Sequence, residues 1–182
     1  MRHRIILIAF ALLSVTVFSG CNGDTYISND DTMLGYDIYK NHKYGYTFSY
    51  PLFLKTMKFG FDSDKKTFTS KDGRISAIAT ARFNHSGRTM KSLLNEERYF
   101  LQRDGYRITY EFSKNGIVVF SGYTPDNKIF YNKIAICDLY SPEFRSIRSV
   151  IARVDVVFED GDRYRGEEIT ELLKKFPYEK RN

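Results

Sequence analysis

Four consecutive segments in the second half of the chain, joined by very short turns, most restrict the possible folds. Apolar and polar residues alternate along them, as they do in strands that bury one face. The connections are too short for a parallel crossover, which needs about a dozen residues. One of them, Asn115-Gly116, is a strong hairpin signal. We therefore predict an antiparallel meander with strands at 106–112, 117–123, 128–140 and 144–158.

The rest of the folded part adds strands before the meander and a helix on each side of it. Strands are predicted at 44–51, 67–69 and 75–83, with a further extended segment within 52–61. Thr89 is a candidate cap for a helix that ends at Gly105, where a left-handed conformation is tolerated. Apolar residues at 169, 172, 173 and 176 share one face of a closing helix, which Pro177 stops. Because helices with single apolar faces must cover a sheet, we expect an α+β fold: an antiparallel sheet covered by two or more helices.

The first 21 residues have the pattern of an export signal. Arg2 and Arg4 precede an apolar run at 5–18, and small residues then lead to Cys21. A basic start, an apolar core of about 7–15 residues and a small-residue exit are typical of a secretory signal peptide. The run is shorter than the roughly 20 residues of a membrane span. The alternative is a buried apolar helix that happens to end in Cys, but such a helix normally has a polar face.

Residues 18–21, Phe-Ser-Gly-Cys, resemble the lipobox of bacterial lipoproteins, in which an aliphatic residue and two small residues precede a cysteine. The resemblance implies cleavage before Cys21 and acylation of its thiol and its new amino group. Several acyl chains are needed, because one chain gives only marginal membrane binding. Phe18 departs from the usual Leu, so cleavage by the ordinary signal peptidase is an alternative. The predicted boundaries are 1–20 for the signal peptide, 21–43 for the lipidated cysteine and a polar tether, and 44–182 for the folded domain.

The start of the predicted domain carries a second resemblance. Residues 44–51, Tyr-Gly-Tyr-Thr-Phe-Ser-Tyr-Pro, resemble the opening of PsbP-like domains, and 118–123 with 128–133 are similar to a later hairpin of that family. The resemblance spans most of the chain after the tether and implies an α/β/α sandwich around an antiparallel sheet. It transfers no catalytic, cofactor or metal residue. Members of the family differ in partner, so the fold does not carry a function.

Few residues have the spacing of a chemical site. The histidines at 3, 42 and 85 lack a second histidine at ligand spacing, which argues against zinc. Asp62 and Asp64, like the acidic turn of Glu159, Asp160 and Asp162, lack the twelve-residue calcium loop. We therefore predict no metal site, no cofactor and no catalytic residue. Alternation splits the basic residues of the two longest strands between faces, and we interpret them as solvated: Lys133, Arg145, Arg148 and Arg153.

Net charge argues against a nucleic-acid partner, and the cysteine content argues against a nucleophilic cysteine. The formal net charge of +6 falls to +4 when Arg2 and Arg4 leave with the signal. The surplus is scattered, whereas a nucleic-acid-binding protein gathers its basic residues on one face. With Cys21 acylated, Cys137 remains, and its alternating apolar neighbours indicate a core residue rather than a nucleophile.

We predict a membrane-anchored, non-enzymatic lipoprotein of the bacterial cell envelope that binds or stabilises another envelope protein. Asn22, in place of the Asp that retains enterobacterial lipoproteins in the inner membrane, favours the outer membrane in a cell that has two. The alternative is a small-ligand or metal-binding module with a tyrosine-lined pocket between sheet and helix. An enzyme whose acidic residues converge from distant positions is a third possibility.

Overall fold

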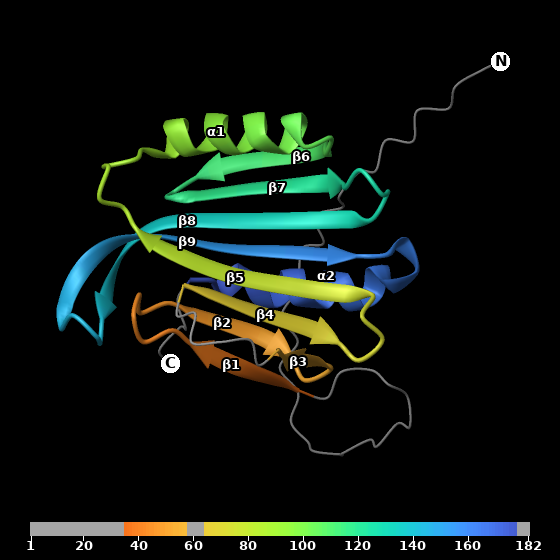
Figure 1. The fold of residues 1–182 in the computed structure, drawn as a ribbon, viewed down its shortest axis with the longest axis horizontal. Coiled ribbons are helices and arrows are strands. Elements are labelled where there is room, and N and C mark those ends of the chain that lie inside the picture. The colour runs from red at the N-terminus through yellow and green to blue at the C-terminus, as the bar shows by residue number, and fades with distance from the viewer. Residues whose placement is uncertain (1–34, 58–63, 178–182) are drawn as a thin grey trace, which may run out of the picture. The chain divides into compact units, whose positions relative to one another are not determined.

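The computed structural model describes residues 35–57 and 64–177, and its main feature is one antiparallel sheet of seven strands (Figure 1). The order across this sheet is β3-β4-β5-β9-β8-β7-β6, and β1 and β2 form a separate two-stranded sheet. The strands are β1 (Tyr36–Lys40), β2 (Thr47–Pro51), β3 (Leu54–Thr56), β4 (Lys65–Ser70), β5 (Ile75–Phe83), β6 (Arg107–Lys114), β7 (Ile117–Tyr123), β8 (Ile129–Ser141) and β9 (Ser146–Phe158).

The predicted meander is confirmed. Strands β6 to β9 follow one another in the chain and in the sheet, and each is antiparallel to the next. Asn115 and Gly116 have φ values of 52° and 77°, as a two-residue hairpin turn of this kind requires. On its other side β9 pairs with β5, which occupies the predicted range. The meander therefore joins the first half of the chain through one long strand pair.

The β1–β2 hairpin begins inside the range predicted as tether. The folded part thus starts several residues before the predicted boundary at residue 44, and Tyr39 of β1 packs edge-on against Phe68 of β4, with ring centroids 5.8 Å apart. In the connection between the two strands, Gly45 has φ 78°, and a Cβ there would lie 2.0 Å from the carbonyl oxygen of Tyr140. Only glycine allows this close approach of the hairpin to β8.

Two helices accompany the sheet. They are α1 (Met90–Arg103) and α2 (Arg163–Leu172), and α2 is flanked by the 3₁₀ turns η1 (Asp160–Asp162) and η2 (Leu173–Lys175). Thr89 caps α1 as predicted: its hydroxyl accepts from the Ser92 N–H, and the Ser92 hydroxyl accepts from the Thr89 N–H. Gly105 follows α1 with φ 81°. No helix of residues 35–57 and 64–177 has the length and apolar character needed to cross a membrane.

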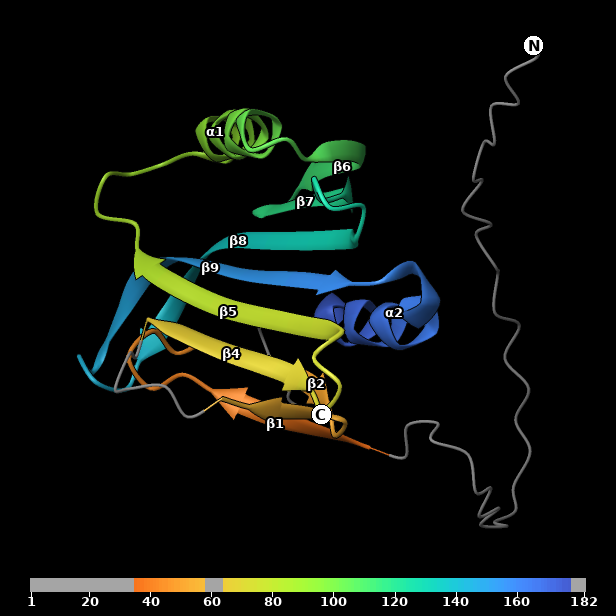
Figure 2. The ribbon, with the colours of Figure 1, turned by 45° about the vertical axis from the view of Figure 1, so that its right-hand side comes forward.

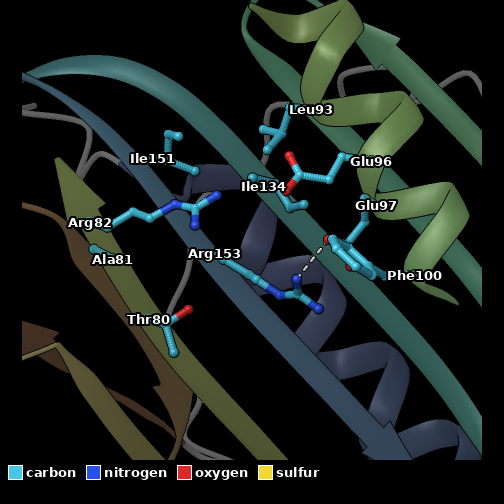
Figure 3. A pocket seen from close by; sticks show the side chains of 10 residues that line it. All are labelled: Thr80, Ala81, Arg82, Leu93, Glu96, Glu97, Phe100, Ile134, Ile151 and Arg153. Atoms are coloured by element: carbon cyan, nitrogen blue, oxygen red, sulfur yellow. Dashed lines mark hydrogen bonds and ion pairs between the residues drawn. The ribbon is translucent and has the colours of Figure 1, made fainter. Parts of the chain in front are cut away.

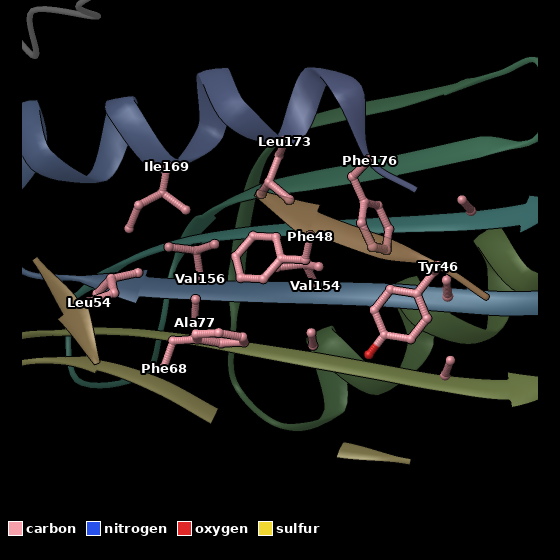
Figure 4. Packing of buried hydrophobic residues seen from close by; sticks show 14 of the residues in the cluster. Tyr46, Phe48, Leu54, Phe68, Ala77, Val154, Val156, Ile169, Leu173 and Phe176 are labelled. Carbon is pink, nitrogen blue, oxygen red and sulfur yellow. The ribbon is translucent and has the colours of Figure 1, made fainter. Parts of the chain in front are cut away.

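Strand alternation divides the buried residues between the two faces of the sheet. On β9, Val150 and Ala152 point to one face and Ile151 to the other. Helix α1 packs against β6 and β7, whereas α2 packs against β9 and β2 (Figures 1 and 2). Figure 4 shows how the α2 face is filled by side chains from the sheet, from α2 and η2, and from β2, among them Phe68, Val154, Ile169, Leu173 and Phe48.

The predicted fold class is wrong. Strands hold 50% of the described residues and helices 22%, so the fold is β-rich rather than an α+β sandwich in which two or more helices cover the sheet. The physical reason is that the β1–β2 hairpin, with Phe48 at its centre, shares the cover of one face with α2. The α/β/α sandwich implied by the family resemblance is corrected together with the fold class.

Candidate functional site

One carboxylate is buried beneath α1. Glu97 lies four residues after Leu93 and four before Leu101, so the helix turns all three side chains towards the sheet. Glu97 is only 7% exposed, and a charged group in such a place needs a partner. Arg153 of β9 provides it: its Nη1 donates to Glu97 Oε2 at 2.8 Å (Figure 3).

Arg153 belongs to a set of polar side chains that links α1 to two strands. Arg153 and Asp155 are two residues apart on β9 and share a face, and Arg153 Nε donates to Asp155 Oδ2 at 2.6 Å. Asn132 lies opposite Asp155 in the β8–β9 register and donates from Nδ2 to Asp155 Oδ1 at 2.5 Å. The same amide donates to Glu97 Oε1 at 3.4 Å. We call Glu97, Asn132, Arg153 and Asp155 the α1 charge cluster.

Burial and mutual attraction set the protonation of this cluster. Burial raises the pKa of the Glu97 carboxyl, and the charge of Arg153 opposes that rise. Burial by itself would lower the pKa of Arg153, but the charges of Asp155 and Glu97 outweigh it and the pKa is raised. Arg153 therefore stays a guanidinium cation. Charged groups held together in a largely buried place are a common mark of a functional site.

A pocket of about 280 Å³ lies beside the α1 charge cluster. Arg82 extends from β5 across β9 towards α1, while Glu96 and Glu97 reach in from the helix (Figure 3). Arg153 completes the charged lining. The lining contains no tyrosine, in contrast to the pocket that the sequence analysis proposed. Its other residues are Thr80, Ala81, Leu93, Phe100, Ile134 and Ile151.

Aromatic side chains lie open on the other face of the same sheet, at its β6 end. Tyr110 and Phe112 of β6 are 48% and 42% exposed. In the strand register Phe112 lies opposite Val119, and Val119 lies opposite Lys133, so these three side chains are on one face of the sheet. Lys133 donates to the Leu173 carbonyl at the end of α2, and this face is therefore the α2 face. We call Tyr110, Phe112, Tyr123 and Tyr131 the aromatic face.

The lipidation residue and the histidines predicted from sequence do not enter either site. Cys21 and His3 lie outside the described residues. His42 is exposed in a turn, and His85 is exposed in a loop with its ring 5.6 Å from that of Phe83. In the part of the chain that the structure describes, no three His, Cys, Asp or Glu side chains come together to hold a metal ion.

The described aspartates of the two acidic motifs are paired with basic side chains. Asp62 lies outside the described residues, and Asp64 accepts from Lys43 Nζ at 2.6 Å and from the Tyr44 hydroxyl at 2.7 Å. Glu159 immediately precedes η1. Asp160 accepts from Arg163. Asp162 is buried between Arg74 and Arg165.

The basic residues singled out in the sequence are separated by the fold. Arg153 lies under α1, Lys133 lies on the opposite face, and Arg145 is in the β8–β9 turn with φ 50°. Arg148 stacks on Phe144, its guanidinium carbon 5.5 Å from the ring centroid. Cys137 is half-buried and packs against the core of the α2 face.

Sequence reasoning missed the residues that form the pocket and the α1 charge cluster, chiefly Arg82, Glu97 and Asn132. Glu97 carried a usable signal, because it holds the same helical spacing as Leu93 and Leu101. Arg82 and Asn132 carried none, since their neighbours depend on strand order. No family model and no curated protein sequence matches this chain, so both sites are interpreted from their own geometry.

Proposed function

We propose that this protein is a non-enzymatic, lipid-anchored lipoprotein of the cell envelope whose domain holds an extended segment of another envelope protein along strand β6. The anchor part rests on the signal-like residues 1–20 and on Cys21. The binding part rests on one observation: β6 ends the sheet and lies beside the aromatic face, and seven of its eight residues are exposed.

The middle of β6 has the properties of a strand that can accept a partner. An edge strand presents unpaired backbone N–H and C=O groups, and proteins usually protect them with charges or bulges. Here the bulge lies between Ile108 and Tyr110, and the charge of Glu111 is balanced by Arg98, whose Nε donates to it at 2.8 Å. Residues 110–113 are therefore left without a protecting net charge or bulge.

The side chains next to this edge supply the contacts that backbone pairing alone lacks. In strand addition the main chain gives affinity, and pockets for alternate side chains give specificity. Tyr110 and Phe112 project onto the same face, and aromatic residues are enriched in protein interfaces. Beyond Ile117, a second hollow of about 260 Å³ lies between β7, β8 and the segment after α2, where Phe176 forms part of its wall.

Site-specific photo-crosslinking tests the proposal in cells that make the full chain. A photo-reactive phenylalanine analogue in place of Phe112 should give one discrete adduct with another envelope protein. The same analogue in place of Tyr99, which is exposed on α1, serves as the control and should not give that adduct.

A backbone variant shows whether the edge itself is used. Because Lys114 and Ile117 flank a two-residue turn, they form a hydrogen-bonded pair, and the N–H of Ser113 points away from β7. Ser113→Pro removes that outward donor and should reduce the adduct several-fold, given about 1 kcal/mol for a hydrogen bond. Ser113→Ala keeps the donor and should crosslink like the original chain. Equal adducts from Ser113→Pro and Ser113→Ala would show that β6 does not pair with the partner.

A further inference from the structure

We infer that the pocket beneath α1 is a binding site for a small organic monocarboxylate, held by Arg82 and resting on the apolar wall formed by Ile134 and Ile151. This inference is independent of the proposed partner, because the pocket and the aromatic face lie on opposite faces of the sheet. It rests on three features: an unpaired cation, the charges around it, and the size and apolar lining of the space.

Arg82 is the cation available to a ligand. No hydrogen bond or ion pair joins its guanidinium to another residue of the described ranges, although it points into the pocket (Figure 3). The two other guanidinium groups nearby are occupied: Arg153 by Glu97 and Asp155, and Arg88 by Glu96. A guanidinium can bind a carboxylate through two parallel N–H···O hydrogen bonds. Arg82 therefore has its donors free for an incoming carboxylate.

The surrounding charges favour an anion at this position. Partial burial lowers the pKa of Arg82, and repulsion from Arg88 and Arg153 adds to that effect, while Glu97 opposes it. An anion beside Arg82 relieves the repulsion among the three cations.

The same surroundings limit the ligand to one negative charge. Glu96 and Glu97 form the α1 side of the pocket, opposite Arg82 (Figure 3). A second anionic group would lie against these carboxylates and be repelled. The site therefore suits a monocarboxylate better than a dicarboxylate or a phosphate ester, which carries close to two charges at neutral pH.

The apolar lining requires a ligand with an apolar body. Leu93, Ile134 and Ile151 form the inner wall, and Phe100 stands at the α1 side. At about 280 Å³ the pocket is slightly smaller than the roughly 300–1,000 Å³ of typical ligand sites. A single ring or a short branched chain fits this space, and benzoate is a suitable probe.

Calorimetric titration of the purified full chain with sodium benzoate tests the inference. We expect saturable binding of benzoate, weaker binding of acetate, which lacks the apolar body, and no comparable binding of benzamide, which has the shape of benzoate without its charge. Arg82→Gln should weaken benzoate binding about tenfold or more, because a charge-assisted bidentate contact is lost. Arg145→Gln makes the same change of charge in the exposed β8–β9 turn and should bind benzoate as the original chain does.

Each possible result of these titrations either supports or overturns the inference. Absence of saturable benzoate binding would overturn the inference, as would equal affinities for benzoate and benzamide. Unchanged affinity in Arg82→Gln would show that another group binds the carboxylate. Arg82→Lys guards against a folding defect: it keeps the charge without the planar fork, and its benzoate affinity should fall between those of Arg82→Gln and the original chain.

Discussion

At the scale of single residues, Lys133 is the charge in the least favourable surroundings. It is 5% exposed on the α2 face, and its Nζ donates to the Leu173 carbonyl at 2.6 Å. That carbonyl lies at the end of the closing helix, where backbone acceptors lack partners within the helix. Burial lowers the pKa of Lys133 to about 8. The ammonium thus caps the helix end, but burial disfavours its charged form.

The lowered pKa predicts how stability varies with pH. The folded pKa of about 8 lies below the unfolded value of 10.5, so between these values the unfolded chain binds more protons. The free energy of unfolding should therefore rise as pH increases from about 8 to 10.5, by about 3 kcal/mol from Lys133 in the limit of the full shift. Urea unfolding at pH 7 and pH 10 measures the effect.

Lys133→Met separates this effect from the titration of tyrosines, which both proteins share. The difference in unfolding free energy, original chain minus variant, should become more favourable to the original chain as pH rises. Parallel pH profiles for the two proteins would show that Lys133 keeps its ordinary pKa in the folded state.

The same residue scale shows why the pocket was missed in the sequence. Glu97 and Arg153 are 56 positions apart and meet only because β9 lies in the sheet beside β8 and under α1. Their pairing depends on strand order and register, which a single sequence does not contain. The sequence analysis considered Arg153 together with Arg148. Both lie on β9, but they are an odd number of positions apart, so their side chains point to opposite faces of the sheet, as strand alternation predicts.

At the scale of elements, the cap of α1 matters because this helix carries Glu96, Glu97 and Phe100 to the pocket. Thr89→Ala removes the hydroxyl that accepts from the Ser92 N–H and should lower the unfolding free energy by about 1 kcal/mol. Thr89→Asp provides another acceptor and should retain most of that stability. Chemical denaturation of the three proteins measures both. Equal losses in the two variants would assign the effect to packing of the threonine methyl group instead of capping.

Strands with one fully buried face could be predicted from the sequence, whereas strands with few or no buried residues could not. The ranges of β5 and β7 agree with their predictions, because alternation between two turns fixes both ends. β1 was assigned to the tether because none of its residues is buried. It pairs with β2, and the two strands together cover part of the sheet. In the described part of the extended segment predicted within 52–61, residues 52–57, the strand residues are the three of β3. Local patterns thus identified most of the strands, but not β1, and not that β2 leaves the main sheet to form a cover with it.

At the scale of the whole molecule, one sheet separates the two proposed binding functions. The pocket uses residues that point towards α1, and the aromatic face uses residues that point towards the α2 side. Side chains alternate along each strand, so a substitution on one face leaves the side chains of the other in place. Arg82→Gln should therefore not affect crosslinking at position 112. Ser113→Pro should not affect benzoate binding for a different reason: β6 contributes no residue to the lining of the pocket.

The proposed lipid anchor would decide whether the domain meets its proposed partner at a membrane. Residues 5–18 are too few to span a bilayer comfortably, whereas several acyl chains on Cys21 would hold the mature protein stably. We expect intact-mass measurement of the membrane-extracted protein to show a chain that starts at Cys21 and carries acyl groups. Cys21→Ser lacks the thiol and should yield no acylated mature chain.

Fractionation of the same cells completes this test, and the mass distinguishes its outcomes. A Cys21→Ser chain that keeps residues 1–20 and sediments with membranes is retained by its uncleaved apolar run, which agrees with a lipoprotein signal that needs the cysteine for processing. A chain cleaved after residue 20 should instead leave the membrane fraction, because nothing remains to hold it there. A Cys21→Ser chain that is processed like the original and still sediments with membranes would disprove lipid anchoring at Cys21. The protein would then be held at the membrane by contacts other than acyl chains on Cys21.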